Sequence, residues 1–218
     1  MQILILGGFL GSGKTTALMQ LARWLVARTS GSSGASGAAD SDGTAGEAGV
    51  RVMILENEVG AVGIDDGLLR SGGFAVDTLF SGCACCTIAG ELDSAARRIR
   101  EAYDPAWLII ETTGIAYPRN MQENLWHSLG VQARIAVLTD AARWQRLRVP
   151  MNELLKGQIE GSDTVLVNKT DLVDEKALQD IERDVFAYEP AARIFRISAT
   201  GEIPGEVWKA VTEGQGQA

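Results

Sequence analysis

The sequence "GFLGSGKT" at residues 8–15 says more about the fold than any other part of the chain. It fits the pattern G-x-x-x-x-G-K-[ST] and directly follows a short apolar run at residues 3–6. The residues after it show a helical period of apolar side chains: Leu18, Leu21, Ala22 and Leu25. Glycines let a backbone wrap closely around phosphate oxygens, and a helix N-terminus adds partial positive charge. The stretch therefore predicts a phosphate-binding loop between a first strand and a first helix.

Within this loop we expect Lys14 to neutralise the β- and γ-phosphates and the Thr15 hydroxyl to bind Mg²⁺. The simpler interpretation is a glycine turn without a ligand, and the predicted strand and helix on either side argue against it. The residues expected to contact the nucleotide here are Gly8, Gly11, Ser12, Gly13, Lys14, Thr15 and Thr16.

The tetrapeptide "NKTD" at residues 168–171 follows a late apolar run and indicates which base is bound. The Asp171 carboxylate can accept hydrogen bonds from both the ring N–H and the exocyclic amine of guanine, which adenine cannot offer. We expect Asn168 and the Lys169 stem to hold the base from the other side, with Ser198 and Ala199 closing over it. GTP is thus the predicted nucleotide. The alternatives are a surface turn and an ATP-using small-molecule kinase.

Two further segments are placed to respond to the γ-phosphate. In "ETTG", Glu111 ends a buried apolar run and is expected to reach Mg²⁺ through water, while Gly114 offers a backbone N–H to the γ-phosphate. We expect catalysis to depend on Lys14, Thr15 and Glu111. The acidic, glycine-rich residues 56–69 predict a switch loop, although its acids could equally be solvated: Glu58, Asp65 and Asp66.

Short apolar runs alternate with helical periods along the chain, which predicts an α/β fold of the P-loop NTPase class. Its central sheet should be mostly parallel, with helices on both faces. Besides residues 3–6, the predicted strands are residues 50–56, 107–111, 131–138, 164–168 and 193–198. Two further helical faces are formed by Leu92, Ala95, Ala96, Ile99 and Tyr103, and by Leu178, Ile181 and Val185.

The chain of 218 residues, 46% of them hydrophobic, is expected to form a single domain over residues 1–218. Residues 29–49 are almost entirely Gly, Ser, Ala and acids, with no large apolar side chain to bury. We expect this segment to be a disordered insertion in a turn.

The net charge is −8, and the basic residues form no long cluster, so nucleic acid is not an expected partner. No run approaches the roughly 18 apolar residues of a spanning helix, and the start of the chain resembles a strand rather than a signal peptide. We therefore expect no membrane contact and a cytoplasmic, reducing location, where close-set cysteines act as thiolates rather than disulfides.

All three cysteines, Cys83, Cys85 and Cys86, fall in "SGCACCT". They could form a metal site, pack in the core or act in redox chemistry. Side chains of adjacent residues point in different directions, which argues against core packing, and adjacent cysteines form only a strained disulfide. Three thiolates would leave a fourth tetrahedral position for water, Glu58 or the only histidine, His127. His127 follows "ETTG" on a predicted helix, where a surface role is more common.

These motifs together resemble the CobW-like metallochaperone GTPases, relatives of the nickel-handling GTPases of urease and hydrogenase maturation. The matching segments span residues 1–202 in family order: "GGFLGSGKTT", "NEVG", "SGCACCT", "ETTG", "NKTDL" and "SATGE". The resemblance implies binding of GTP with Mg²⁺, slow hydrolysis to GDP, and nucleotide-dependent binding of Zn²⁺, Co²⁺ or a related metal such as Ni²⁺ at the C-x-C-C thiols. It also implies a partner: a client metalloprotein or a cofactor-insertion enzyme of a cobalamin-type pathway.

The sequence departs from the family pattern at Val59, where phenylalanine is usual, and at Tyr117, where aspartate is common, so rate and metal coupling are expected to differ. The sequence ends at Ala218, whereas many members continue into a second domain, so we expect the GTPase domain alone. No glutamine or arginine finger is evident, which predicts slow hydrolysis without a client. A homodimer is possible. The alternative function is a GTP-gated conformational activator of a corrinoid or metal enzyme, with only structural metal.

Overall fold

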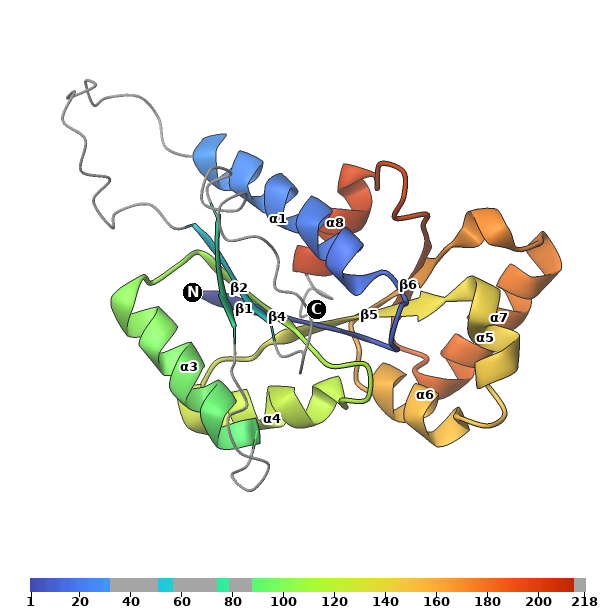
Figure 1. The fold of residues 1–218 in the computed structure, drawn as a ribbon, viewed down its shortest axis with the longest axis horizontal. Coiled ribbons are helices and arrows are strands. Elements are labelled where there is room, and N and C mark those ends of the chain that lie inside the picture. The colour runs from blue at the N-terminus through green and yellow to red at the C-terminus, as the bar shows by residue number, and fades with distance from the viewer. Residues whose placement is uncertain (32–50, 57–73, 79–87, 214–218) are drawn as a thin grey trace.

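The computed structural model describes residues 1–31, 51–56, 74–78 and 88–213. Within these ranges seven strands form one parallel sheet in the order β3-β2-β4-β1-β5-β6-β7. The strands are β1 (Gln2–Gly8), β2 (Val52–Glu56), β3 (Phe74–Thr78), β4 (Trp107–Glu111), β5 (Arg134–Asp140), β6 (Thr164–Asn168) and β7 (Arg193–Arg196). Helices cover both faces of the sheet (Figure 1), which confirms the predicted α/β class.

Strand β1 lies at the centre of the sheet, where Ile5 pairs with Ile110 of β4 and Ile135 of β5. Alternate β1 side chains enter two separate cores, because successive residues of a strand point to opposite faces. Ile3 and Ile5 join one core, and Leu4 and Leu6 join the other. A strand covered on both faces must be apolar at every position, which explains the unbroken "ILIL" run.

Among the described residues, two helices cover one face of the sheet: α1 (Lys14–Gly31) and α8 (Gly205–Glu213). The other face is covered by α3 (Ile88–Ala102), α4 (Pro118–Leu129), α5 (Ala141–Leu147), α6 (Asn152–Ile159) and α7 (Glu175–Tyr188). A short 3₁₀ helix, η1 (Thr170–Leu172), follows β6. None of these helices is both long and apolar enough to cross a membrane.

Most of the predicted elements are confirmed. Strands β4 and β6 have the predicted bounds, whereas β5 starts and ends later than predicted and β7 ends two residues earlier. The prediction that Tyr103 belongs to the helical face of Leu92, Ala95, Ala96 and Ile99 is wrong: Tyr103 follows α3 and is 45% exposed, while the other four residues are buried. Helix α1 continues through Gly31, into the segment predicted as an insertion. Residues 32–49 lie outside the described ranges.

The strand order places the loop after β1 at a change of direction in the sheet. The chain first adds β2, β3 and β4 on one side of β1, and then crosses to add β5, β6 and β7 on the other. In open α/β sheets, ligands bind beyond the carboxyl ends of the strands at such a point. The segments after β1, β4, β5, β6 and β7 all meet at this edge, and four of them carry predicted site residues.

Candidate nucleotide site

The loop after β1 depends on glycine at three positions. Gly8, Gly11 and Gly13 have φ values of 137°, 72° and 98°, a region that side chains with a Cβ rarely adopt. At Gly13 a Cβ would also lie 2.4 Å from the amide nitrogen of Asn168. The Lys14 side chain is 6% exposed, and its Nζ donates to the Gly8 carbonyl at 3.1 Å. The fold thus holds this loop in the conformation that its glycines permit.

Three consecutive carbonyls of this loop accept hydrogen bonds from side chains at the neighbouring strand ends. The Asn168 Nδ2 donates to the Ser12 carbonyl at 2.8 Å, and the Lys169 Nζ donates to the Gly11 carbonyl at 2.8 Å. An Arg143 guanidinium nitrogen donates to the Leu10 carbonyl. A loop that turns its N–H groups inward toward phosphate must turn carbonyls outward, and these contacts satisfy them.

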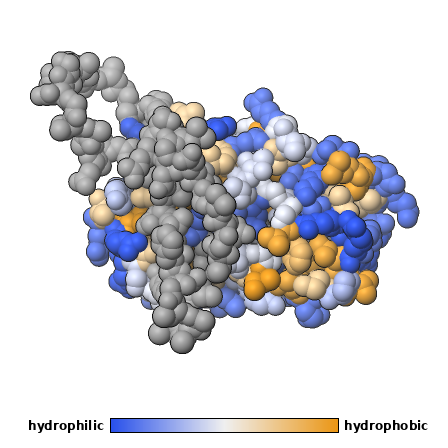
Figure 2. Space-filling model, viewed as in Figure 1, coloured by the Kyte–Doolittle hydropathy of each residue, from blue (hydrophilic) through white to orange (hydrophobic). Residues whose placement is uncertain are grey.

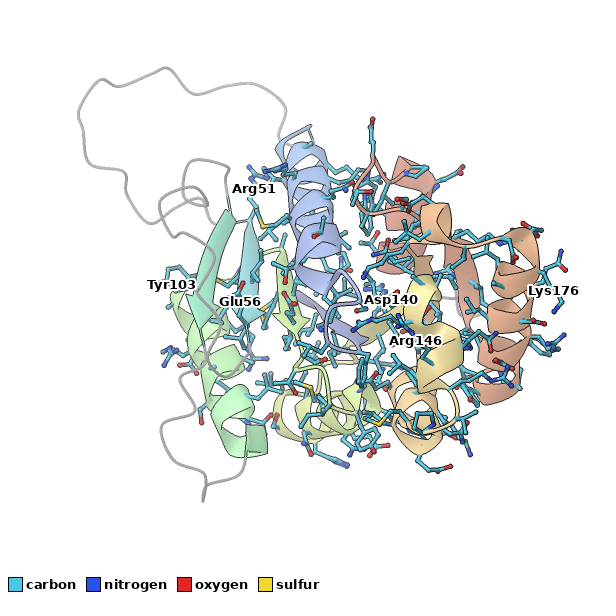
Figure 3. All side chains as sticks on the ribbon, turned by 45° about the vertical axis from the view of Figure 1, so that its right-hand side comes forward. Arg51, Glu56, Tyr103, Asp140, Arg146 and Lys176 are labelled. Atoms are coloured by element: carbon cyan, nitrogen blue, oxygen red, sulfur yellow. The ribbon has the colours of Figure 1, made fainter. Side chains whose placement is uncertain are left out.

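Asp140, labelled in Figure 3, lies at the end of β5 and holds two of those donors in place. Its Oδ2 accepts from the Lys169 Nζ and from the Arg143 Nε, both at 2.7 Å. The residue is 3% exposed. Burial raises the pKa of the Asp140 carboxyl, but the hydrogen bonds from Lys169 and Arg143 outweigh burial and leave the pKa below its ordinary value. The carboxylate therefore stays charged at neutral pH.

The sequence analysis did not single out Asp140 or Arg143. A usable signal was present, because an aspartate directly after a buried strand and before a helix is a common N-cap. The Asp140 Oδ1 indeed accepts from the backbone N–H of Arg143 at 3.2 Å, in the first turn of α5. Its second role is to hold the Lys169 and Arg143 side chains against the loop. This role depends on contacts between segments far apart in the sequence, which a local pattern cannot predict.

The two residues predicted to bind Mg²⁺ lie in direct contact. The Thr15 hydroxyl donates to Glu111 Oε1 at 3.0 Å, and Glu111 is 4% exposed at the end of β4. Glu56 pairs with Glu111 in the register of β2 and β4, so a second carboxylate ends at the same edge (Figure 3). A hydroxyl beside a carboxylate is a donor set of hard oxygen atoms, which fits Mg²⁺.

Gly114 lies against the phosphate loop. A Cβ on this residue would stand 2.7 Å from the backbone nitrogen of Leu10, so the two backbones approach too closely for any side chain. The Gly114 carbonyl accepts from the Nε2 of Gln158 at 2.9 Å. The prediction that Gly114 borders the phosphate site fits this position.

The residues predicted to hold the base gather after β6 and β7. Asp171 is exposed, and its Oδ1 accepts from the Ser198 hydroxyl at 2.6 Å. Asn168 is 2% exposed, and besides donating to Ser12 it accepts from the backbone N–H of Ala199 at 2.8 Å. In this structure the Asn168 amide therefore ties the phosphate loop to the segment after β7, a position that sequence reasoning did not foresee.

The predicted transition-metal ligands fall largely outside the described residues: Cys83, Cys85, Cys86 and Glu58. The same holds for Val59, Asp65 and Asp66. His127 is described, and it is exposed on α4. Within the ranges that the structure covers, no group of three His, Cys, Asp or Glu side chains could hold a metal ion.

Comparison of the sequence with known proteins identifies a family and several relatives. The profile of the family described as "CobW/HypB/UreG, nucleotide-binding domain" matches residues 41–196, more than half of the chain. A protein named "Zinc chaperone CobW" from Sinorhizobium sp is 27% identical over 244 aligned residues, covering 97% of this chain and 62% of the relative. The chain spans between half and 62% of the length of the first three curated relatives that it matches.

Solved structures support the fold. The hydrogenase maturation factor HypB from Archaeoglobus fulgidus superimposes with a TM-score of 0.63 at 16% identity, covering 95% of this chain and 86% of that protein. The Zn(II)-bound YjiA GTPase from E. coli superimposes with a TM-score of 0.61 at 20% identity, covering 97% of this chain and 61% of that protein. At these identities the likeness establishes a shared architecture.

Proposed function

The chain belongs to the CobW/HypB/UreG nucleotide-binding domain family, and from this membership we propose that it binds and hydrolyses GTP and couples its nucleotide state to metal binding. One observation carries the proposal: the glycine-rich loop and the "NKTD" segment, about 150 residues apart in the sequence, are joined by hydrogen bonds. Asn168 and Lys169 each donate to a carbonyl of the loop at 2.8 Å. A chance glycine turn would not need these two contacts.

We assign the roles at the phosphates as follows. The Lys14 ammonium neutralises the β- and γ-phosphates, and the backbone N–H groups of residues 11–16 bind their oxygens. Thr15 binds Mg²⁺ directly, and Glu111 holds it through water; the 3.0 Å contact between these side chains supports that assignment. Bound Mg²⁺ would neutralise charge on the β- and γ-phosphate oxygens.

At the base, the Asp171 carboxylate accepts from guanine, Ser198 fixes that carboxylate, and Ala199 borders the ring. The 2.6 Å hydrogen bond between Ser198 and Asp171 supports this assignment, because it orients the carboxylate before the base arrives. The Lys169 stem packs on the ring while its ammonium stays on the Gly11 carbonyl and on Asp140.

The metal is the cargo of this activity rather than a resident cofactor. We propose that Cys83, Cys85 and Cys86 bind it as thiolates, with Glu58 or water as a fourth ligand, and that Zn²⁺ is the first ion to test. The name "Zinc chaperone CobW" of a relative supports zinc. Co²⁺ remains a second candidate on ligand chemistry, because thiolates also accept it.

A client metalloprotein would receive the metal and read the nucleotide state. Apolar side chains beside the nucleotide site support such a partner: Leu10 is 59% exposed and Ile115 is 72% exposed. Figure 2 shows further hydrophobic residues gathered over the region of α6. Grouped exposed apolar side chains commonly mark protein contacts.

Substitution of Asp171 tests the nucleotide assignment. Asp171→Asn replaces one acceptor oxygen by an N–H₂ donor, which opposes the guanine amine and matches the carbonyl of xanthine at that place. We expect GTP affinity to fall about a hundredfold or more, with xanthosine triphosphate bound in its place, because buried polar groups left unpaired are costly. Equilibrium titration with both nucleotides and with ATP measures this.

Asp180→Asn is the matched control for this substitution. Asp180 lies on α7 and makes surface ion pairs with Lys176 and Arg183. Such exposed pairs contribute little to the stability of the fold. This variant should bind GTP as the wild type does. A wild-type protein that prefers ATP, or an Asp171→Asn variant that retains GTP affinity, would contradict the proposal.

A further inference from the structure

Gln158 is a buried polar residue that belongs to none of the nucleotide-binding motifs. It lies in α6, is 2% exposed, and shares this helix with the core residues Leu155 and Ile159. Burying an amide costs free energy unless the amide is hydrogen-bonded. Its Nε2 donates to the Gly114 carbonyl at 2.9 Å, 44 residues away in the sequence. The Gln158 amide is therefore buried among apolar side chains, and its Nε2 is satisfied by one backbone carbonyl, that of Gly114.

That partner lies directly against the phosphate loop. The Gly114 backbone is held between Leu10 on one side, where a Cβ would approach the Leu10 nitrogen to 2.7 Å, and Gln158 on the other. Gln158 also lines a small internal cavity together with Phe9 and Thr139, behind the phosphate loop. Helix α6 thus supports both the loop and the segment that faces it.

A second contact joins α6 to the same segment. A Cβ on Gly157 would stand 2.4 Å from Cε1 of Tyr117, so the tyrosine ring lies on the helix backbone. Tyr117 is the residue immediately before α4 and carries no side-chain hydrogen bond that caps this helix. Adjacent residues of α6, Gly157 and Gln158, therefore contact residues 117 and 114 of the segment that links β4 to α4.

We propose that Gln158 is a positioning residue for recognition of the γ-phosphate. By holding the Gly114 carbonyl, it fixes the backbone on which the Gly114 N–H is carried, without touching the nucleotide itself. This inference rests on the proposed GTP function. GTP and GDP differ only in the γ-phosphate, so a residue that acts through Gly114 must affect GTP binding more than GDP binding.

The test compares the affinities of two variants for GDP and for a non-hydrolysable GTP analogue, both with Mg²⁺. Gln158→Met keeps the size of the side chain and removes the donor. Gln158→Glu keeps its length, and its carboxylate can only accept. In each we expect the analogue to bind about tenfold more weakly and GDP to change by less than about twofold, in line with the loss of one buried hydrogen bond. With GTP as substrate, kcat/KM should fall by a similar factor.

Gln122→Met is the matched control. Gln122 on α4 makes an equivalent contact, Nε2 to the Ala133 carbonyl at 2.6 Å, away from the phosphate loop. Gln122→Met should leave the ratio of the affinities for the GTP analogue and for GDP unchanged, even if it lowers the stability of the protein. A Gln158 variant that weakens the binding of both nucleotides equally, or of neither, would overturn the inference without refuting the proposed GTP function. A wild-type protein that binds no guanine nucleotide would instead refute the proposed function.

Discussion

Asp140 shows how one buried charge can serve two distant contacts. Its carboxylate binds Lys169 and Arg143, and each of these donates to a different carbonyl of the phosphate loop. Removing one partner of a buried ion pair is more costly than losing a surface pair, because the remaining charges lose their compensation. The shape of the phosphate loop should therefore depend on a residue that touches no nucleotide.

Asp140→Asn should lower the free energy of unfolding by about 2 kcal/mol at neutral pH, since Asn retains part of the hydrogen bonding but not the charge. It should weaken the binding of GTP and of GDP to a similar extent, because the loop is proposed to bind phosphates that both nucleotides share. Urea unfolding monitored by circular dichroism measures the first effect, and nucleotide titration the second.

The pH dependence of the same variant follows from the lowered pKa of Asp140. Its folded-state pKa lies below the ordinary value of 3.8, so its stabilising effect is present above pH 4 and is lost as the pH falls through the folded pKa. The stability difference between wild type and Asp140→Asn should narrow below pH 4. Glu123→Gln, which breaks an exposed pair with Arg119, is the control. A stability difference between wild type and Asp140→Asn that stays constant with pH would contradict this account.

At the scale of elements, α1 fixes more than the phosphate loop at its start. Gln20, two turns into this helix, donates to the carbonyls of Ala199 and Gly201 at 2.9 and 2.8 Å and accepts from the Ile203 N–H at 3.0 Å. The helix that carries Lys14 and Thr15 therefore also holds the segment after β7. The proposed phosphate contacts and the proposed base contacts therefore depend on the same helix.

Gln20→Met should loosen the segment of residues 198–203. We expect a loss of about 2 kcal/mol in unfolding free energy, because three hydrogen bonds disappear and the backbone groups become partly solvated. GTP and GDP affinities should fall together, since both carry guanine. Gln179→Met, which removes only an exposed contact with Glu175 on α7, should change neither quantity. Unchanged guanine affinity in Gln20→Met would show that this segment does not contribute to the base site.

The sequence predicted those elements whose residues carry a strong local pattern. "WLIIE" and "TVLVN" are continuous apolar runs, and β4 and β6 have their predicted bounds. The strand "FAVDT" has the same length, but it was not predicted because an aspartate interrupts its apolar run. Helices α5 and α6 have only seven and eight residues, too few for a clear helical period.

The same limit applies to the site. The glycine-rich loop and "NKTD" are recognisable because the chemistry of phosphate and guanine demands fixed residues at fixed spacing. Asp140, Gln20 and Gln158 have ordinary sequence surroundings, and their roles arise from tertiary contacts. Each bonds to a segment between 29 and 183 residues away, which a local pattern cannot reveal.

At the scale of the whole molecule, the sheet edge brings the proposed Mg²⁺ ligands next to the strand that leads toward the cysteines. Glu111 of β4 pairs in register with Glu56 of β2, which pairs with Thr78 of β3. The segment with Cys83, Cys85 and Cys86 follows Thr78 by a few residues. Only a few residues of the chain separate this edge from the thiolates. If γ-phosphate binding reorganises the edge, the nucleotide state would set the metal affinity of the cysteines through this short segment.

The most direct test of this coupling is a Co²⁺ titration of the apo protein with Mg²⁺ and either GDP or a non-hydrolysable GTP analogue. Thiolate coordination gives Co²⁺ an intense charge-transfer absorption, and a variant with all three cysteines changed to serine supplies the baseline. We predict that affinity at the cysteines differs at least about tenfold between the two nucleotides, a coupling of about 1.4 kcal/mol. Equal affinity in both states, or no thiolate absorption in either, would contradict the account and favour a GTP-gated activator without metal delivery.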